Sequence, residues 1–321
     1  MSALLEVEGL RVTIGSTAAV RGASITVNKG ETHCLVGESG CGKSISALSV
    51  MGLLPRGSRR ETTALRFAGQ EIGRFSEAEM SRLRGDRMAM IFQEPMTSLN
   101  PAYTVGSQMT EVLRRHRGAT RVQAVDRAAE LLARVGITAP GLRLGQVPHQ
   151  LSGGLRQRVM IAMALMCDPE LLIADEPTTA LDVTVQAQIL DLLADLRRET
   201  GMALVFITHN LGVVAEIAER VVVMYAGQVV EQGETAEVFA RPLHPYTRAL
   251  IAAVPEGDDK PAAIPGVVPP PHALPPGCRF APRCPYAAAV CDAAVPALDR
   301  HDGRLVRCVR VDAVAREGVA A

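Results

Sequence analysis

A single motif of eight residues constrains the fold of this chain more than any other feature of its sequence. The motif has the pattern G-x-x-x-x-G-K-S, lies between an apolar run at 34–36 and a helical pattern at 45–54, and reads Gly37-Glu38-Ser39-Gly40-Cys41-Gly42-Lys43-Ser44. Glycines let successive backbone N–H groups face one point, and the following helix directs its positive end there, which favours the binding of phosphate. Lys43 would reach the terminal phosphates of a nucleotide, and the hydroxyl of Ser44 would ligate Mg²⁺. The alternative is a glycine-rich turn with a chance lysine, but the strand before the motif and the helix after it favour a phosphate-binding loop.

Composition narrows the class of protein. The chain has 321 residues, of which 48% are hydrophobic and 21% are charged, so most of it is expected to form a folded α/β protein. Its formal net charge is zero, so nothing indicates bulk electrostatic attraction to nucleic acid or to anionic lipid. The first residues lack a basic segment followed by an apolar one, and no stretch of about twenty residues is free of charges and helix breakers. We therefore expect neither a signal peptide nor a transmembrane helix, and any membrane role would come through partners.

Polar residues follow three predicted strands at the point where each strand ends. They are Gln93 after 88–92, Asp175 and Glu176 after 171–174, and His209 after 203–207. The carboxyl ends of strands in an open α/β sheet are a common place for active-site groups. Asp175 is then a candidate ligand of Mg²⁺, and Glu176 is a candidate to activate a water molecule. The alternative is that both carboxylates simply lie in a solvated turn. A lone histidine is more often structural, but at this edge of a sheet His209 is a candidate contact of the γ-phosphate.

Strand and helix patterns alternate through the first 240 residues. Short strands are predicted at 4–14, 24–27 and 65–68, and a hairpin joins 221–225 to 228–231. The remainder of the stretch from Pro55 to Arg87 is polar and irregular. Helical periodicity covers 105–135, 153–167 and 183–199, and Ser152 is a suitable N-cap for the second of these. A mostly helical block is therefore expected to be inserted into an otherwise strand-and-helix chain.

The composition changes near the C-terminus. Residues 255–285 hold many of the chain's 20 prolines, which predicts a stiff, extended segment. Four cysteines follow with the spacing C-x5-C-x6-C-x16-C, namely Cys278, Cys284, Cys291 and Cys308. In a chain without an export signal such a group favours metal binding over disulfides. Structural zinc usually has closer C-x2-C pairs, so an iron–sulfur cluster, zinc and unligated thiols all remain open. The other three cysteines are expected to be ordinary buried thiols.

Taken in order, the motifs resemble those of ATP-binding cassette (ABC) ATPases. The resemblance rests on 37–44, Gln93, 151–158, 171–176, 180–182 and His209, and it covers nearly the whole chain. It implies an α/β fold with a P-loop NTPase (RecA-like) core, an inserted helical subdomain at about 95–165 and a C-terminal proline- and cysteine-rich extension. The expected domains are an ABC nucleotide-binding domain at 1–240 and the extension, with its four-cysteine cluster, at 241–321.

Finer features resemble one branch of these ATPases, the subunits of dipeptide and oligopeptide importers. They are 92–101, 177–190, 244–250 and 277–285, of which the last two are the more discriminating. The resemblance implies an ATPase that energises import of di- or oligopeptides from the cytoplasmic face of the bacterial inner membrane. Its implied partners are a related, non-identical ATPase subunit, two transmembrane permease subunits and a periplasmic or extracellular substrate-binding protein. It also implies a [4Fe–4S] cluster on the four cysteines.

Two alternatives stay open. The first is the same role in the uptake of nickel or another small solute, which related subunits perform. The second is the role of a soluble cassette ATPase in translation or DNA repair, which belongs to a different class.

The same resemblance assigns roles to the candidate residues. Two subunits would pair head to tail, so that ATP on the phosphate loop of one is capped by Ser152, Gly153 and Gly154 of the other. Asp175 would help to hold Mg²⁺, Glu176 would polarise the attacking water, and His209 would contact the γ-phosphate. Gln93 would sense Mg²⁺ or water, and Asp182 would lie across the dimer interface.

The sequence departs from the ABC pattern in the first strand. Many cassette ATPases stack adenine on an aromatic residue there, whereas the first aromatic of this chain is Phe67. Adenine would instead rest on an aliphatic surface such as Ile14, which loses about 1 kcal/mol of stacking.

Overall fold

The structure is a computed structural model that describes residues 3–94, 98–178, 183–254 and 263–317. The chain divides into two units. Unit 1 consists of Met1–Leu4, Asn28–Glu31 and Arg74–Phe206, and unit 2 consists of Leu5–Val27, Thr32–Gly73 and Ile207–Ala321. Both units contain helices and strands, so the predicted α/β class is confirmed. The predicted domain boundary near residue 240 stays a prediction.

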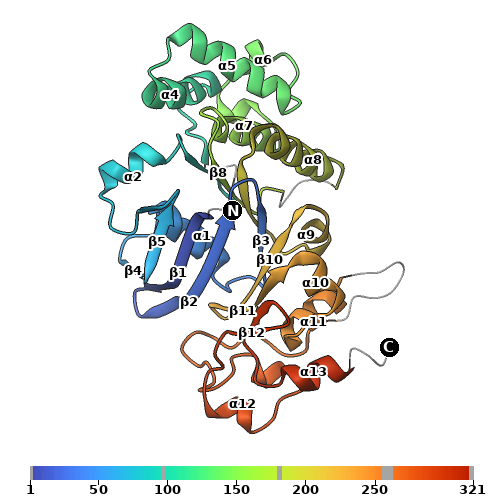
Figure 1. Ribbon diagram of the computed structural model, residues 1–321. Helices are drawn as coiled ribbons and strands as arrows, with labels where there is room; N and C mark the ends of the chain where they lie inside the picture. Colours follow the sequence, from blue (N-terminus) through green and yellow to red (C-terminus); the bar gives the residue numbers. More distant parts are fainter. Residues whose placement is uncertain (1–2, 95–97, 179–182, 255–262, 318–321) are drawn as a thin grey trace. The chain divides into compact units, whose positions relative to one another are not determined.

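Unit 2 contains an antiparallel sheet built from the first strands of the chain. Its strands are β1 (Ala3–Ile14), β2 (Thr17–Asn28), β4 (Ser58–Glu61), β5 (Ala64–Phe67) and β6 (Gln70–Glu71). The order is β2-β1-β5-β6, with β4 also paired to β1 (Figure 1). Leu5 lies opposite Phe67 and Val7 opposite Leu65, and all four side chains are buried. The period-2 burial of such apolar residues fixes the register, because a shift by one residue would turn them toward solvent.

The strand that leads into the phosphate loop lies in the second sheet of unit 2. This strand, β3 (Thr32–Val36), is buried at all five positions and is parallel to β10 (Arg220–Tyr225). Beyond β10 come β11 (Gln228–Glu234), β13 (Arg304–Val306) and β12 (Asp299–His301), in that order. The predicted hairpin is confirmed, since β10 and β11 are antiparallel and joined through Ala226 and Gly227, which both have positive φ.

Helices of unit 2 follow several of these strands. They are α1 (Lys43–Met51), α9 (Leu211–Ile217), α10 (Thr235–Ala240), α11 (Pro245–Ala252), η2 (Ala281–Arg283), α12 (Val290–Ala293) and α13 (Val311–Glu317). Residues 263–280, which hold many of the prolines, form neither helix nor strand. This agrees with the prediction that the proline-rich segment is not helical, because proline lacks the N–H that a helix interior needs.

Unit 1 combines three strands with a group of helices. The strand order is β9 (Ala203–Ile207), β8 (Leu171–Asp175) and β7 (Met88–Ile91), with β7 and β8 parallel. The helices are α2 (Glu77–Leu83), α4 (Val105–Arg117), α5 (Arg121–Arg134), α6 (Pro140–Leu144), η1 (Pro148–Gln150), α7 (Gly153–Ala164) and α8 (Val183–Thr200). Helices α4 and α5 lie side by side, with α6 close to α5 (Figure 1). The predicted helical block is thus confirmed in unit 1.

Several elements differ from the prediction. The strand predicted at 24–27 is longer and begins at Thr17, and the helix predicted at 45–54 ends at Met51. The pattern at 105–135 is two helices, because Gly118 ends α4 with φ 63 and Thr120 caps α5. The helix predicted over 153–167 stops at Ala164. The stretch expected to be irregular contains α2, which begins at a capping box between Ser76 and Glu79. The S-x-x-E spacing signals such a start, but the helix has only two buried residues and therefore little hydrophobic periodicity.

Candidate functional site

The phosphate loop connects β3 to α1 in unit 2, and its glycines are required by its backbone. Gly37, Gly40 and Gly42 have φ values of 147°, 78° and 102°, which residues with a Cβ rarely adopt. A Cβ on Gly37 would lie 2.2 Å from the carbonyl oxygen of Met224, so no larger residue fits there without movement of the backbone. The helix α1 then begins at Lys43, with Gly42 at its N-cap. This loop has the strand–loop–helix context that the sequence predicted.

Lys43 is held inside the loop by the loop's own backbone. Its side chain is buried, and Nζ donates to the carbonyl oxygens of Gly37 at 2.7 Å and Glu38 at 3.2 Å. The ammonium group is therefore positioned within the turn that carries the N–H groups of the loop. A buried cation beside a helix N-terminus is a strong site for phosphate oxygens. Ser44 follows in the first turn of α1, where its hydroxyl fits the role of an oxygen ligand to Mg²⁺.

Cys41 lies in the same loop and is a buried thiol. Its Sγ accepts from Lys43 Nζ at 3.7 Å. Burial raises the pKa of the thiol, and the positive charge of Lys43 opposes this only in part. Cys41 therefore remains protonated near neutral pH, which suits a packing role rather than a reactive one.

His209 also belongs to unit 2, two residues after β9 ends in the sequence. The preceding residue, Thr208, donates its backbone N–H to the carbonyl oxygen of Leu35 at 3.2 Å, which places the histidine beside the last residues of β3. His209 is exposed. Asn210 caps α9 by accepting from Gly212 N at 3.0 Å. The structure thus places His209 after a buried strand, as the sequence predicted, and before a helix that the sequence analysis did not predict.

Gln93 and the acidic pair belong to unit 1. Asp175 is buried at the last position of β8, and Glu176 follows it. Nε2 of Gln93 donates to Oε2 of Glu176 at 3.3 Å, so the structure brings these two predicted residues together. Glu176 has φ 47°, a left-handed conformation that is uncommon for a residue with a side chain. Such conformations cluster at functional sites, which supports a specialised role for this carboxylate.

The loop at 151–154 presents the N-terminus of α7. Ser152 is its N-cap and accepts from Leu155 N at 3.4 Å, which confirms the predicted cap. Ser152 and Gly153 are exposed, and in the described part of the chain a Cβ on either Gly153 or Gly154 would meet nothing within 4 Å. An open helix N-terminus with two glycines allows the close approach of an anion or of another chain.

Gln157 connects this helix to the acidic pair and has no predicted role. Its side chain is buried, and its amide donates to the carbonyl oxygen of Pro177, directly after Glu176. The one sequence signal for such a contact is that Gln157 is the polar residue among the otherwise apolar buried residues of α7. Asp182 and the rest of 179–182 lie outside the described residues.

The four C-terminal cysteines lie in one region of unit 2. The backbone N–H of Cys278 donates to the carbonyl oxygen of Cys291 at 2.7 Å. Burial raises the pKa of Cys284 to about 11 and that of Cys308 to about 12, and in both cases charges on other cysteines of the group add to the shift. Among the described residues, however, no group of three or more His, Cys, Asp or Glu side chains is arranged to hold a metal ion. The predicted [4Fe–4S] cluster therefore gains no direct support from the geometry.

Two models of known protein families match the sequence of this chain. Residues 20–179 match the family model described as ABC transporter, and residues 230–291 match the model for the C-terminal region of oligopeptide/dipeptide transporters. The chain belongs to the ABC transporter family. The predicted family, and with it the prediction of an ATPase, is confirmed.

Individual relatives extend over almost the whole chain. The chain is 52% identical to the dipeptide transport ATP-binding protein DppD of Escherichia coli (strain K12), over 95% of this chain and 96% of the relative. It is 50% identical to the oligopeptide transport ATP-binding protein AppD of Bacillus subtilis (strain 168), over 96% and 97%. A putative peptide import ATP-binding protein of Brucella melitensis is 52% identical, over 97% and 98%.

Solved structures show the same fold. The ATP-binding cassette MJ0796, in a dimeric post-hydrolysis state bound to ADP and Pi, is similar with a TM-score of 0.64 and 26% identity. The similarity covers 72% of this chain and 98% of that one. CbiO1 of Clostridium perfringens, part of the ABC transporter complex cbiONQ, has a TM-score of 0.64 and 27% identity, over 75% and 92%. The ABC ATPase fold predicted from the motifs is confirmed.

Proposed function

We propose that this chain is the ATP-hydrolysing subunit that energises the import of dipeptides or oligopeptides by an ABC transporter. The phosphate loop, with Lys43 buried at its centre, supports the nucleotide part of the proposal. The match of residues 230–291 to the C-terminal region of peptide transporters carries the peptide part. Relatives that are about half identical over almost their full length are named for dipeptide, oligopeptide or peptide transport.

The proposed chemistry assigns one task to each polar group. Lys43 and the loop N–H groups bind the β- and γ-phosphates. Ser44 and Asp175 are the proposed ligands of Mg²⁺, which neutralises phosphate charge, and oxygen donors of this kind suit that ion. Glu176 orients and polarises the attacking water, and its hydrogen bond to Gln93 restrains the carboxylate. His209 is the proposed contact of the γ-phosphate.

The exposed start of α7 supports a head-to-tail dimer. Ser152, Gly153 and Gly154 would cap the ATP that is bound to a second, related ATPase subunit, and Asp182 would lie in the same interface. Two transmembrane permease subunits and a substrate-binding protein are the other proposed partners. None of the helices in the described part of the chain is both long and apolar enough to cross a membrane. We place the subunit at the cytoplasmic face of the cell membrane, attached through the permeases.

The four cysteines are proposed to hold a [4Fe–4S] cluster that pins the C-terminal extension. Their support is proximity. Burial and the neighbouring Cys278, Cys284 and Cys291 raise the pKa of Cys308, and the backbone N–H of Cys278 donates to the carbonyl oxygen of Cys291. Thiolates are the usual ligands of such clusters. Protein purified without oxygen should contain stoichiometric iron and absorb at about 400 nm. Absence of both signals would remove the cluster from the proposal.

A substitution of Glu176 tests the ATPase mechanism. In the assembled transporter, Glu176→Gln should bind ATP as the wild type does but lose about a hundredfold or more of its ATPase rate, because the amide cannot accept the proton of water. Glu130→Gln, at an exposed position of α5, is the matched control and should keep the rate. Near wild-type turnover by the Glu176 variant would refute the proposed role. Uptake of labelled dipeptide into vesicles that contain the complex tests the substrate.

A further inference from the structure

Glu38, the second residue of the phosphate loop, is tied to the C-terminal segment by both its backbone and its side chain. Its N–H donates to the hydroxyl of Tyr246 at 2.8 Å. Its carboxylate accepts two hydrogen bonds from Arg283, with Nη1–Oε2 at 2.8 Å and Nη2–Oε1 at 3.1 Å. Two parallel charge-assisted bonds of this kind define the position of a carboxylate more strictly than a single bond does.

Arg283 is itself fixed by its surroundings. Its side chain is only 3% exposed, and Nε donates to the carbonyl oxygen of Pro265 at 2.8 Å. The guanidinium carbon lies 5.8 Å from the ring centres of both Tyr225 and Phe280. The partner of Glu38 is therefore a buried, rigid cation rather than a mobile surface side chain.

This cation belongs to the segment that carries the first two clustered cysteines. Arg283 ends the short helix η2, and Cys284 follows it. The N–H of Cys284 donates to the carbonyl oxygen of Ala281 at 3.2 Å, within the same turn. A change in the backbone at Cys284 would therefore move Arg283 directly.

We infer that Arg283 is a positioning residue for nucleotide binding, which holds the phosphate loop in its binding shape through Glu38. The carbonyl of Glu38 is one of the groups that hold Lys43, at 3.2 Å, so displacement of Glu38 disturbs both the N–H groups and the ammonium that meet phosphate. The inference rests on the proposed ATPase function. It adds that the cysteine-bearing segment, although remote in sequence, sets the affinity of the loop for ATP.

The test measures nucleotide binding and steady-state kinetics of the full-length protein. Arg283→Gln and Glu38→Gln should each raise the Kd and KM for MgATP about tenfold and leave kcat at saturating ATP nearly unchanged. The double variant should bind no more weakly than either single variant, because both remove the same contact. Arg300→Gln, an exposed arginine of the C-terminal segment, should change neither constant.

Two further measurements keep the inference open to refutation. If Arg283→Gln does not fold, Arg283→Lys keeps the charge but loses the paired bonds and should show a smaller increase in KM. Unchanged Kd and KM in a folded Arg283 variant, or additive losses in the double variant, would overturn the positioning role. A wild-type protein that binds no nucleotide would instead refute the proposed function.

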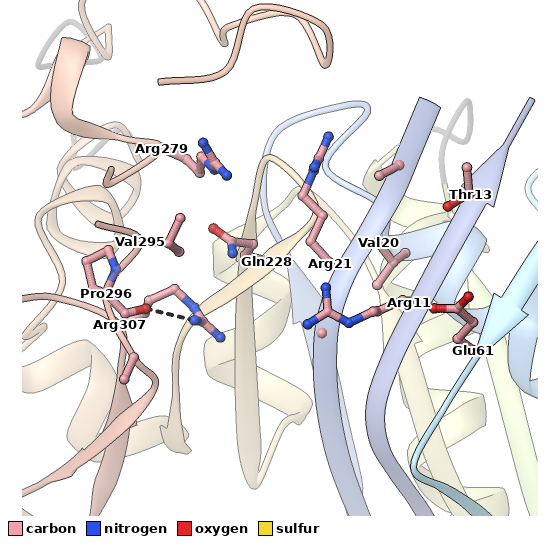
Figure 2. Close-up of a pocket in the computed structure, with 13 residues that line it drawn as sticks. Arg11, Thr13, Val20, Arg21, Glu61, Gln228, Arg279, Val295, Pro296 and Arg307 are labelled. Carbon is pink, nitrogen blue, oxygen red and sulfur yellow. Dashed lines mark hydrogen bonds between the residues drawn. The ribbon is translucent and has the colours of Figure 1, made fainter. Parts of the chain in front are cut away.

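A second, independent feature is a cavity of about 610 Å³ in unit 2. Strands β1 and β2 line one side and the C-terminal segment lines the other, and four arginines converge on it, namely Arg11, Arg21, Arg279 and Arg307 (Figure 2). Among the described residues that line it, Glu61 is the one carboxylate, and it also pairs with Arg59 at 2.8 Å.

The positive charge of this cavity is poorly balanced. Burial lowers the pKa of Arg21, and the charge of Arg279 lowers it further. Nε of Arg279 is buried and has no hydrogen-bond partner among the described residues. Arg307 is better satisfied, because it donates to the carbonyl oxygens of Val229 and Pro296 at 2.8 and 2.9 Å. To the described residues, the side chain of Arg21 donates one long hydrogen bond, from Nη2 to the carbonyl oxygen of Pro271 at 3.4 Å. A guanidinium has five N–H donors, so Arg21 and Arg279 keep donors with which to bind an anion.

The geometry points to a site for a phosphate-bearing anion, either a free small molecule or the headgroup of an anionic lipid. The test uses full-length protein with Lys43→Ala, so that the phosphate loop does not compete. Inorganic pyrophosphate should bind saturably in calorimetry, and the added pair Arg21→Gln and Arg279→Gln should weaken binding at least about tenfold, whereas Arg300→Gln should not.

Binding to phosphatidylglycerol vesicles but not to pyrophosphate, with the same arginine dependence, would identify the lipid source. Absence of binding in both assays, or binding that does not depend on Arg21 and Arg279, would overturn the proposal.

Discussion

His244 should make the stability of the C-terminal region depend on pH. It caps α11, where its Nδ1 accepts from the backbone N–H of Tyr246 at 3.0 Å. The side chain is 1% exposed, and burial, with a further contribution from the charge of Arg307, lowers the pKa of the imidazole to about 3. The folded state therefore holds neutral His244, with Nδ1 as an acceptor.

The direction of the effect follows from this depressed pKa. In the unfolded chain His244 has its ordinary pKa of about 6.5 and takes up a proton that the folded state excludes. The contribution of neutral His244 to the free energy of unfolding is fully present above about pH 6.5. It is lost progressively as the pH falls toward about 3, the pKa of His244 in the folded state. At about pH 5 the loss is about 2 kcal/mol, from 1.4 kcal/mol for each of about 1.5 pH units.

The substitution His244→Asn isolates this effect. Asparagine is a good N-cap whose side-chain oxygen can accept from Tyr246 N, but it does not titrate. The free energy of unfolding is measured in urea at a series of pH values from about 7.5 to 5. Below pH 6.5 it should fall less steeply with decreasing pH in the variant than in the wild type, by about 1.4 kcal/mol per pH unit. The variant should be less stable at neutral pH, because the smaller side chain leaves a cavity.

The control is His272→Asn, since His272 is exposed. It should leave the pH dependence of the wild type unchanged. Parallel pH curves for the wild type and the His244 variant would refute the reasoning.

Further substitutions test the phosphate loop and the expected adenine contact in β1. Lys43→Ala should abolish nucleotide binding in a titration, because it removes the cation at the centre of the loop. Gly37→Ala should lower the free energy of unfolding by about 2–4 kcal/mol, because its Cβ would clash with the carbonyl oxygen of Met224. Gly40→Ala should lower the free energy of unfolding less, because a Cβ there meets open space. Equal decreases in the two variants would argue against the clash. Ile14→Tyr should tighten ATP binding by about 1 kcal/mol while inorganic triphosphate binds as before; equal changes for both ligands would show that adenine does not rest there.

Local sequence signals predicted the elements that carry the proposed chemistry. The phosphate loop, the strand before it and the helix after it all lie between Thr32 and Met51, where glycine, lysine and the apolar run act together. The same holds for β8 and its acidic end, and for the hairpin at Ala226 and Gly227, whose positive φ values suit glycine and a tight turn. In each of these cases, residues that are close in the sequence determine the geometry.

Contacts between distant residues could not be predicted in this way. Glu231 and Arg304 form a buried ion pair at 3.4 Å, and Glu231 also accepts from the backbone N–H groups of Leu243 and His244. These groups are separated by 12 to 73 residues. The pairing of β13 with β11 is of the same kind. No pattern within a single segment determines which distant strand or carboxylate it will meet.

Glu176 shows how local and distant information combine at the site. The sequence predicted a role for it, because a carboxylate after a buried strand suggests a group that activates water. It gave no sign of the left-handed backbone, with φ 47°, since glycine or asparagine is favoured there and a larger side chain costs about 1 kcal/mol. Two contacts near the turn come from other segments: Gln93, which follows β7, donates to the carboxylate, and Gln157 of α7 donates to the carbonyl of Pro177. Because one of these hydrogen bonds is made by the carboxylate itself and both partners lie outside β8, the direction of this carboxylate depends on the unit around it as well as on the strand that carries it.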